Sequence, residues 1–170
     1  MTNIVYVDKD DNVVGAGPRA EANERGMGRR IVRIFLYNSK GELLIQKRAD
    51  TLRYMPGKWD HSAAGHVDEG EDYTTAAYRE LKEELGVAGV ELREIKKVPM
   101  ENHEVPGIWM FNMLYTLTYD GPFVPNKGEV AELKWIKPDE LRAWMEREPD
   151  LFPPGFIFTF KEFSALQKGA

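Results

Sequence analysis

Three glutamates stand within five consecutive positions near the middle of the chain: Glu80, Glu83 and Glu84. On an α-helix, residues three and four positions apart lie on the same face, so this spacing would bring the three carboxylates together. Left alone, their charges would repel one another and weaken the helix, whereas a divalent cation would turn that repulsion into coordination. The spacing therefore predicts a site for Mg2+ or Mn2+.

The glutamates belong to a longer pattern, GHVDEGEDYTTAAYRELKEELGV, which spans residues 65–87. It matches the Nudix box, G-x5-E-x7-R-E-U-x-E-E-x-G-U with U a bulky aliphatic residue, at every defined position: Gly65, Glu71, Arg79, Glu80, Leu81, Glu83, Glu84, Gly86 and Val87. The chain thus resembles the Nudix hydrolase family. A solvated acidic helix face, the usual explanation of a charge run, accounts for neither the arginine nor the glycines at their spacings.

The resemblance implies a reaction and a cofactor. The expected activity is that of a pyrophosphohydrolase, which cleaves a nucleoside diphosphate linked to another moiety X. Bound Mg2+ (or Mn2+) would neutralise the diphosphate oxygens and lower the pKa of a coordinated water. Glu80, Glu83 and Glu84 match the catalytic, metal-binding glutamates of the family, and the backbone carbonyl of Ala64 matches a further metal ligand.

The other box residues are expected to act through structure. Arg79 and Glu71 resemble the pair that fixes the loop of the box against its helix. Gly65 and Gly86 are expected to serve backbone geometry, because glycine adopts conformations that other residues avoid.

The family often supplies one more carboxylate from a loop before a late strand. Here NKGEVAELKW offers Glu129 and Glu132, three residues apart. Glu129 is the better candidate because it stands at the end of the loop, whereas Glu132 is expected near the start of the strand. A plain surface charge is the alternative for either residue.

A second resemblance extends from about Val7 to Val87 and concerns Nudix proteins related to isopentenyl-diphosphate isomerase. It is carried by VDKDDNVVG, LYNSKGELLIQKRA and MPGKWDHSAAGHV. Isomerases place basic residues near the diphosphate, which implies substrate-binding roles for Arg48 and Arg53. The alternative is that both are surface cations of a loop.

The isomerase reaction itself is not expected. It needs a cysteine at the position of Ala64, and the chain has no cysteine. Isomerases also bind metal through histidines before the first long strand, where this chain reads GMGRR, so only His66 is left of that set. We expect a hydrolase, with an isomerase-like protein or a non-catalytic sensor of a diphosphate metabolite as alternatives.

No recognisable pattern identifies X. Residues 101–111 (ENHEVPGIWMF) and the loop 54–59 are expected to line its pocket, and nucleotides are favoured over prenyl diphosphates. Four aromatic residues could stack on a base, although aromatic side chains on strands usually belong to the core: Tyr54, Trp59, Trp109 and Phe111.

The composition is that of an ordinary globular protein, with 42% hydrophobic and 30% charged residues among 170. The absence of cysteine is compatible with a reducing cytoplasm, which we expect as the location. The first residues lack the order of a signal peptide, and no apolar run is long enough to span a membrane. The net charge of -5 argues against general nucleic-acid binding. Nothing indicates an oligomeric state.

The order of elements predicts an α+β fold. Strands are expected over 4–7, 13–14, 31–37, 43–47, 62–65, 90–98, 108–119 and 133–136, and helices over 73–85, from 138 and over 156–167. The Nudix resemblance implies the same architecture: an α/β/α sandwich with a mixed β-sheet and a loop-helix-loop catalytic motif. We expect residues 1–170 to form a single Nudix hydrolase domain.

Overall fold

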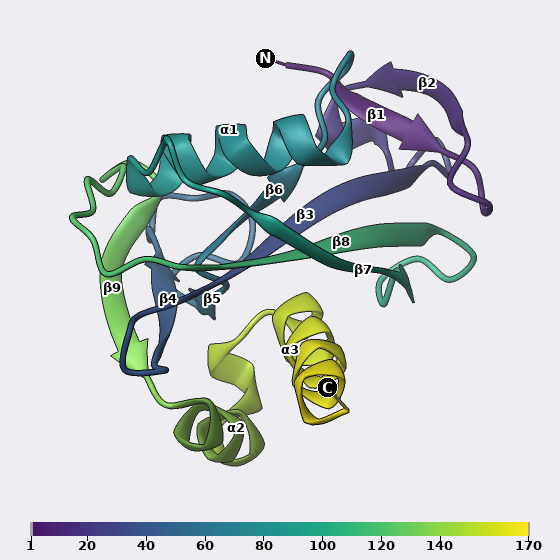
Figure 1. Cartoon of the computed structure of the whole chain (residues 1–170). Helices are drawn as coiled ribbons and strands as arrows, with labels where there is room; N and C mark the ends of the chain where they lie inside the picture. The colour runs from purple at the N-terminus through teal and green to yellow at the C-terminus, as the bar shows by residue number, and fades with distance from the viewer. Residues whose placement is uncertain (1, 170) are drawn as a thin grey trace.

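A mixed β-sheet lies between helix α1 on one face and helices α2 and α3 on the other, which confirms the expected sandwich (Figure 1). The computed structural model describes residues 2–169. Its strands are β1 (Ile4–Val7), β2 (Val13–Gly17), β3 (Gly28–Tyr37), β4 (Leu43–Arg48), β5 (Trp59–Asp60), β6 (Ala63–His66), β7 (Arg93–Glu101), β8 (Trp109–Thr118) and β9 (Val130–Ile136). Its helices are η1 (Arg19–Glu21), α1 (Tyr73–Leu85), α2 (Pro138–Arg147), η2 (Pro149–Leu151) and α3 (Pro154–Lys168).

Strand β3 is the centre of the sheet. It pairs in parallel with β8 and antiparallel with β1, β4 and β6. The antiparallel partners of these strands extend the sheet outwards, β2 beyond β1, β7 beyond β8, and β5 and β9 beyond β4. The parallel pair joins segments about eighty residues apart, with the box and β7 between them.

Alternate residues of β3 enter two separate cores, because successive side chains of a strand point to opposite faces. Val32, Ile34 and Leu36 belong to the cluster that also holds the buried residues of α1. Phe35 belongs to the cluster on the α3 side and stacks on Phe163, with 4.2 Å between ring centroids. The same parity places Arg29, Ile31 and Arg33 on the α3 face.

The ends of α1 are set by the residues that the sequence indicated. Asp72 caps the first turn, where its side chain accepts a hydrogen bond of 2.7 Å from the Thr75 amide. Gly86 ends the helix in the left-handed conformation, with φ of 67°. The helix spans Tyr73–Leu85, as predicted.

Some strand boundaries were predicted wrongly, and long-range pairing explains most of the differences. Strand β3 starts at Gly28 because Gly28 and Arg29 pair with β1. Trp59, expected in a loop, pairs with Lys47 and begins β5. Strand β7 starts at Arg93 because the Leu92 amide donates instead to the Tyr78 hydroxyl. No helix within residues 2–169 has the length and apolar character needed to cross a membrane.

Candidate active site

The box loop and α1 bring the predicted carboxylates into one cavity of about 580 Å3. Glu80, Glu83 and Glu84 enter it from α1, and Glu129 enters from the residue before β9. Ala64 of β6 also lines this cavity. Residues that are distant in the chain, from Thr2 to Glu129, thus share one space, which we call the glutamate cavity.

Glu84 is the most deeply held of these carboxylates, with only 5% of its surface exposed. Its Oε2 atom accepts hydrogen bonds from Gln46 Nε2, at 2.7 Å, and from the Ala64 amide, at 3.1 Å. Burial raises the pKa of Glu84 well above its ordinary value, and the neighbouring charge of Glu80 raises it further. The side chain is therefore fixed in position but strained electrostatically.

The pKa of Glu80 is also raised by burial. Burial raises its pKa to about 7, Arg79 opposes this shift, and the charges of Glu83 and Glu129 add to it. Glu80 therefore lies close enough to Glu83 and Glu129 for their charges to act on it.

Arg79 links the box loop to α1 through several hydrogen bonds. Its guanidinium donates to both carboxylate oxygens of Glu71, at 2.7 and 2.9 Å, and to the His66 carbonyl at 3.0 Å. It also donates to Glu80 at 2.7 Å and to Glu83 at 3.2 Å. Bidentate pairing of this kind fixes geometry as well as charge.

Glycine is required at the two box positions, 65 and 86, for different physical reasons. A Cβ atom at Gly65 would collide with the Glu80 carboxylate, so the backbone of β6 approaches that carboxylate only because residue 65 has no side chain. Gly86 combines its positive φ with a close approach to Val124, whose Cβ would lie 2.9 Å from an added Cβ. One glycine makes room for the site and the other ends the helix.

The donor chemistry of the cavity fits a hard divalent cation, because its acidic side chains offer only carboxylate oxygens, which Mg2+ prefers. Within residues 2–169, no three acidic, histidine or cysteine side chains are gathered as a set of metal ligands. Glu80 is turned to Arg79, Glu84 to Gln46 and Glu129 to the Asn126 amide group. A cation would compete with these donors for oxygens that crowding has already destabilised.

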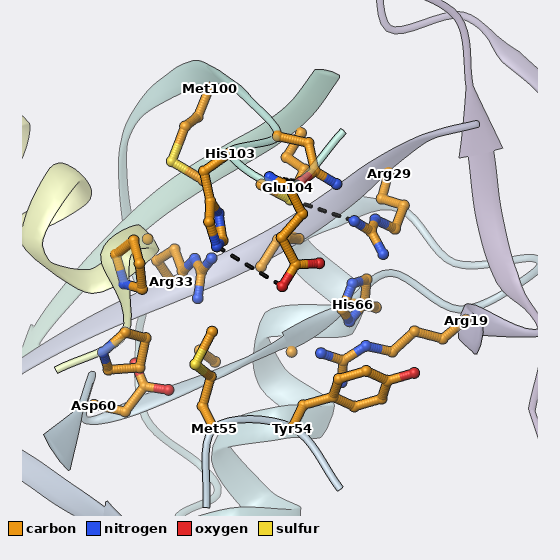
Figure 2. Close-up of a pocket in the computed structure, with 18 of the residues that line it drawn as sticks. Arg19, Arg29, Arg33, Tyr54, Met55, Asp60, His66, Met100, His103 and Glu104 are labelled. Carbon is orange, nitrogen blue, oxygen red and sulfur yellow. Dashed lines mark hydrogen bonds and ion pairs between the residues drawn. The ribbon is translucent and has the colours of Figure 1, made fainter. Parts of the chain in front are cut away.

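A second cavity, of about 190 Å3, adjoins the first and shares five lining residues with it: Arg19, Arg48, Ala64, Gly65 and His66. Figure 2 labels three of its arginines, Arg19, Arg29 and Arg33, which reach the cavity from different sides. We call it the arginine cavity. Tyr54, Asn102 and His103 also line it, so the cavity includes residues of both segments that the sequence favoured for a substrate pocket.

The two basic residues predicted to bind the substrate lie in different places. Arg48 lines both cavities and donates to the Tyr54 carbonyl at 2.9 Å and to Asp60 at 3.3 Å. Arg53 is exposed on the following loop, with its guanidinium 5.4 Å from the centre of the Tyr54 ring, and lines neither cavity. The structure thus brings Arg48, but not Arg53, to the glutamates.

Of the remaining residues that the sequence suggested for the site, some lie in the hydrophobic cores and others line a cavity. Trp59 and Phe111 are buried in the two cores, and Trp109 packs against one of them, so only Tyr54 among the four aromatics lines a cavity. His66 lines both cavities. Burial and the charges of three arginines lower its pKa well below the ordinary value, so its ring is neutral.

Several cavity residues were missed by the sequence reasoning: Arg19, Arg29, Arg33 and Gln46. A signal for two of them was present, since Arg29 and Arg33 interrupt an otherwise buried strand, and arginine is seldom buried without a partner. For Gln46 and Arg19 we find no such signal.

Comparison with known proteins places this chain in one family. A family profile for the NUDIX domain matches residues 27–154. The chain is 38% identical over 136 residues to an uncharacterized Nudix hydrolase, PA4841, of Pseudomonas aeruginosa, covering 80% of this chain and 79% of that protein. It is 32% identical over 160 residues to isopentenyl-diphosphate Delta-isomerase 2 of Photorhabdus laumondii, covering 90% and 87%. The crystal structure of DR0079 from Deinococcus radiodurans superposes with a TM-score of 0.82 at 26% identity, over 94% of this chain and 98% of that one.

The protein belongs to the Nudix family and is a hydrolase of diphosphate bonds. Its relatives include proteins named Nudix hydrolase and proteins named isopentenyl-diphosphate isomerase, which form a subgroup of the same fold.

Proposed function

We propose that this protein is a Mg2+-dependent pyrophosphohydrolase that cleaves a nucleoside diphosphate linked to another moiety X. The observation that carries the proposal is the gathering of Glu80, Glu83, Glu84 and Glu129 in one cavity that Arg48 also lines. Carboxylates suited to a cation and a guanidinium suited to phosphate oxygens are what cleavage of a diphosphate requires.

Glu80, Glu83 and Glu84 would hold the cation, together with the backbone carbonyl of Ala64. When bound, Mg2+ (or Mn2+) supplies neutralisation of the diphosphate oxygens and makes water at the site more acidic. Glu129 contributes a fourth carboxylate to the same cavity, from the residue before β9.

The other residues act on position. Arg79 is held by Glu71 and fixes the box loop. This loop connects α1 to β6, the strand that contains Ala64 and Gly65. Arg48 orients the diphosphate, since a planar guanidinium matches phosphate oxygens in pairs. Arg53 stays a predicted contact, which a substrate reaching over the loop would make.

The test is a screen for phosphate or monophosphate release with Mg2+, on nucleoside di- and triphosphates, nucleotide sugars, dinucleotides, coenzyme A and prenyl diphosphates. We expect turnover of at least one nucleotide. Binding of a nucleotide without turnover would favour the sensor. Turnover confined to diphosphates without a nucleoside would disprove the nucleotide preference and leave the hydrolase.

The isomerase relatives make a second test worthwhile. Purified protein with isopentenyl diphosphate and Mg2+ should give no dimethylallyl diphosphate, because the methyl group of Ala64 neither donates nor accepts a proton. Formation of the isomer at enzymatic rates would contradict the proposed function.

A further inference from the structure

The four arginines of the arginine cavity divide into two pairs. Arg19 and Arg48 also line the glutamate cavity, where a diphosphate would lie. Arg29 and Arg33 line only the arginine cavity, and both come from the same face of β3. We call Arg29 and Arg33 the inner arginines. They lie outside the cavity in which the diphosphate would bind, so binding of the diphosphate does not explain their presence.

Neither inner arginine forms an ion pair with any residue in the part of the chain that the structure describes. Arg29 donates through Nη2 to Asn23 Oδ1, at 3.0 Å, and its Nε is buried with no hydrogen-bond partner among residues 2–169. Arg33 donates through Nε to Asn112 Oδ1, at 2.9 Å. Within residues 2–169 its side chain forms no other hydrogen bond. Both guanidinium groups keep donor capacity.

Arg33 is also held in place before any ligand arrives. Asn112 is fully buried, and its Nδ2 donates to the Val98 carbonyl at 3.2 Å, which turns its Oδ1 towards Arg33. At the start of α3, residue 155 is a glycine, and a Cβ there would lie 3.0 Å from Arg33 Nη2. The fold thus fixes the guanidinium and leaves room around it.

Acidic groups lie near both arginines, with the charge of Asp60 acting on Arg33 and that of Glu104 on Arg29, but within residues 2–169 neither acid forms an ion pair with them. Asp60 is engaged by His61 at 2.6 Å and by Arg48 at 3.3 Å. Glu104, on the exposed loop after β7, lies 3.9 Å from His103. Burial lowers the pKa of both Arg29 and Arg33, although arginine stays protonated at any ordinary pH.

A guanidinium that is removed from water and has no ion-pair partner destabilises the folded protein, and such groups persist mainly where function needs them. The cavity also has apolar walls, among them Ile31, Met100 and Met110, which lower the local dielectric constant and strengthen any charge interaction inside. An anionic ligand would satisfy both arginines at once.

We propose that Arg29 and Arg33 bind a further anionic group of the substrate, a phosphate or carboxylate carried outside the diphosphate that is cleaved. This inference rests on the proposed function for the position of the diphosphate. A volume of about 190 Å3 is below the roughly 300–1,000 Å3 of sites that enclose a drug-sized ligand, so the cavity holds this group and not a whole nucleoside. A neutral prenyl chain would leave both arginines desolvated and without an ion-pair partner.

The first experiment measures anion binding without turnover. In EDTA the glutamate cavity repels anions, so inorganic phosphate should raise the melting temperature through the arginines and approach saturation. Arg33→Met and Arg29→Met should each weaken this phosphate affinity about tenfold or more, because each removes charge-assisted hydrogen bonds.

Arg93→Met is the matched control, since Arg93 is exposed on β7 and lines neither cavity. Sodium chloride at equal ionic strength corrects for general salt effects. Circular dichroism and the melting temperature without phosphate establish that the variants fold. Phosphate affinity that is unchanged in both inner variants, or that is lost only in Arg48→Met and Arg19→Met, would overturn the proposal.

The second experiment uses substrate pairs that differ by one phosphate: coenzyme A and dephospho-coenzyme A, NADPH and NADH, and ATP and ADP. We expect kcat/KM in at least one pair to favour the member with the extra phosphate by about tenfold, and Arg33→Met to remove this preference. Equal kcat/KM within all three pairs would overturn the anionic subsite while the hydrolase stands. No turnover of any substrate would count against the proposed function alone, because the phosphate affinities in EDTA still decide on the subsite.

Discussion

The glutamate cavity and the arginine cavity lie side by side but are built in different ways. Three of the four glutamates come from a single helix within a stretch of 23 residues. The ends of this helix are set by local signals, the Asp72 cap and the left-handed Gly86. The arginines come from η1, β3 and β4, and the walls around them from the loop after β7 and the start of α3. Most of the carboxylates proposed to hold the cation are close together in sequence, whereas the cavity proposed to select the substrate is assembled by folding.

The two cavities also carry opposite electrostatic stress. In the glutamate cavity, burial and mutual repulsion raise the pKa of Glu80 and Glu84, which favours binding of a cation. In the arginine cavity, burial lowers the pKa of Arg29 and Arg33, which favours binding of an anion. A polyanionic substrate together with a divalent metal would relieve both, and the following predictions test this contrast.

The largest effect is expected from metal removal. EDTA should reduce turnover to background, because diphosphate oxygens would then face uncompensated carboxylates, and Mg2+ should restore it. Mg2+ should also stabilise the protein, by about 2.7 kcal/mol at a hundredfold excess over its Kd. Activity that survives exhaustive chelation would contradict the role given to the glutamates.

The loss of kcat on replacing a single glutamate should increase with the burial of that glutamate in the cavity. Glu84→Gln and Glu80→Gln should each lower kcat by about 10²–10³-fold, because several kcal/mol of charge stabilisation are lost while the fold survives. Glu129→Gln should lower kcat less than Glu84→Gln. Glu146→Gln, on the exposed face of α2, is the control. Equal and small losses at all three positions would mean that the cation binds elsewhere.

Gly65→Ala tests the packing that joins β6 to α1. Its Cβ would collide with the Glu80 carboxylate, so we expect destabilisation by about 1–3 kcal/mol together with reduced activity. Gly15→Ala is the control, because an added Cβ there meets no atom within 4 Å. In the double variant with Glu80→Ala, part of the stability should return. Additive losses would show that the collision is not the cause.

The smallest effect is a pH dependence of the metal-free protein. The pKa of Glu80 is about 7 in the folded state and 4.5 ordinarily, so the folded protein binds the proton more tightly. This contribution to the free energy of unfolding is present below about pH 4.5 and is lost as pH rises to about 7. Denaturant unfolding in EDTA at several pH values should show a decline in stability over this window that is weaker in Glu80→Gln. An unchanged slope in the variant would exclude Glu80 as the source.

The loop-helix-loop could be predicted almost completely because its signals are local. Helix periodicity, the Asp72 cap and the left-handed Gly86 act within a few residues, and they placed Glu80, Glu83 and Glu84 on one face. The strand boundaries were less predictable, since β3 is lengthened by pairing with β1 and β5 exists through pairing with β4. Such pairing depends on partners far away in the chain.

The sequence by itself determined the residues of the proposed chemistry: a set of carboxylates, the arginine that is bonded to them, and the glycine that lets a strand approach. The tertiary structure decided the surroundings. It set Gln46 against Glu84, separated Arg48 from Arg53, and moved Trp59 and Phe111 into the cores. It also brought Arg29 and Arg33 together with Arg19 around one small cavity. The physical reason is that a side chain's position on its own helix follows from short-range geometry, whereas its burial and its partners depend on elements that only folding brings together.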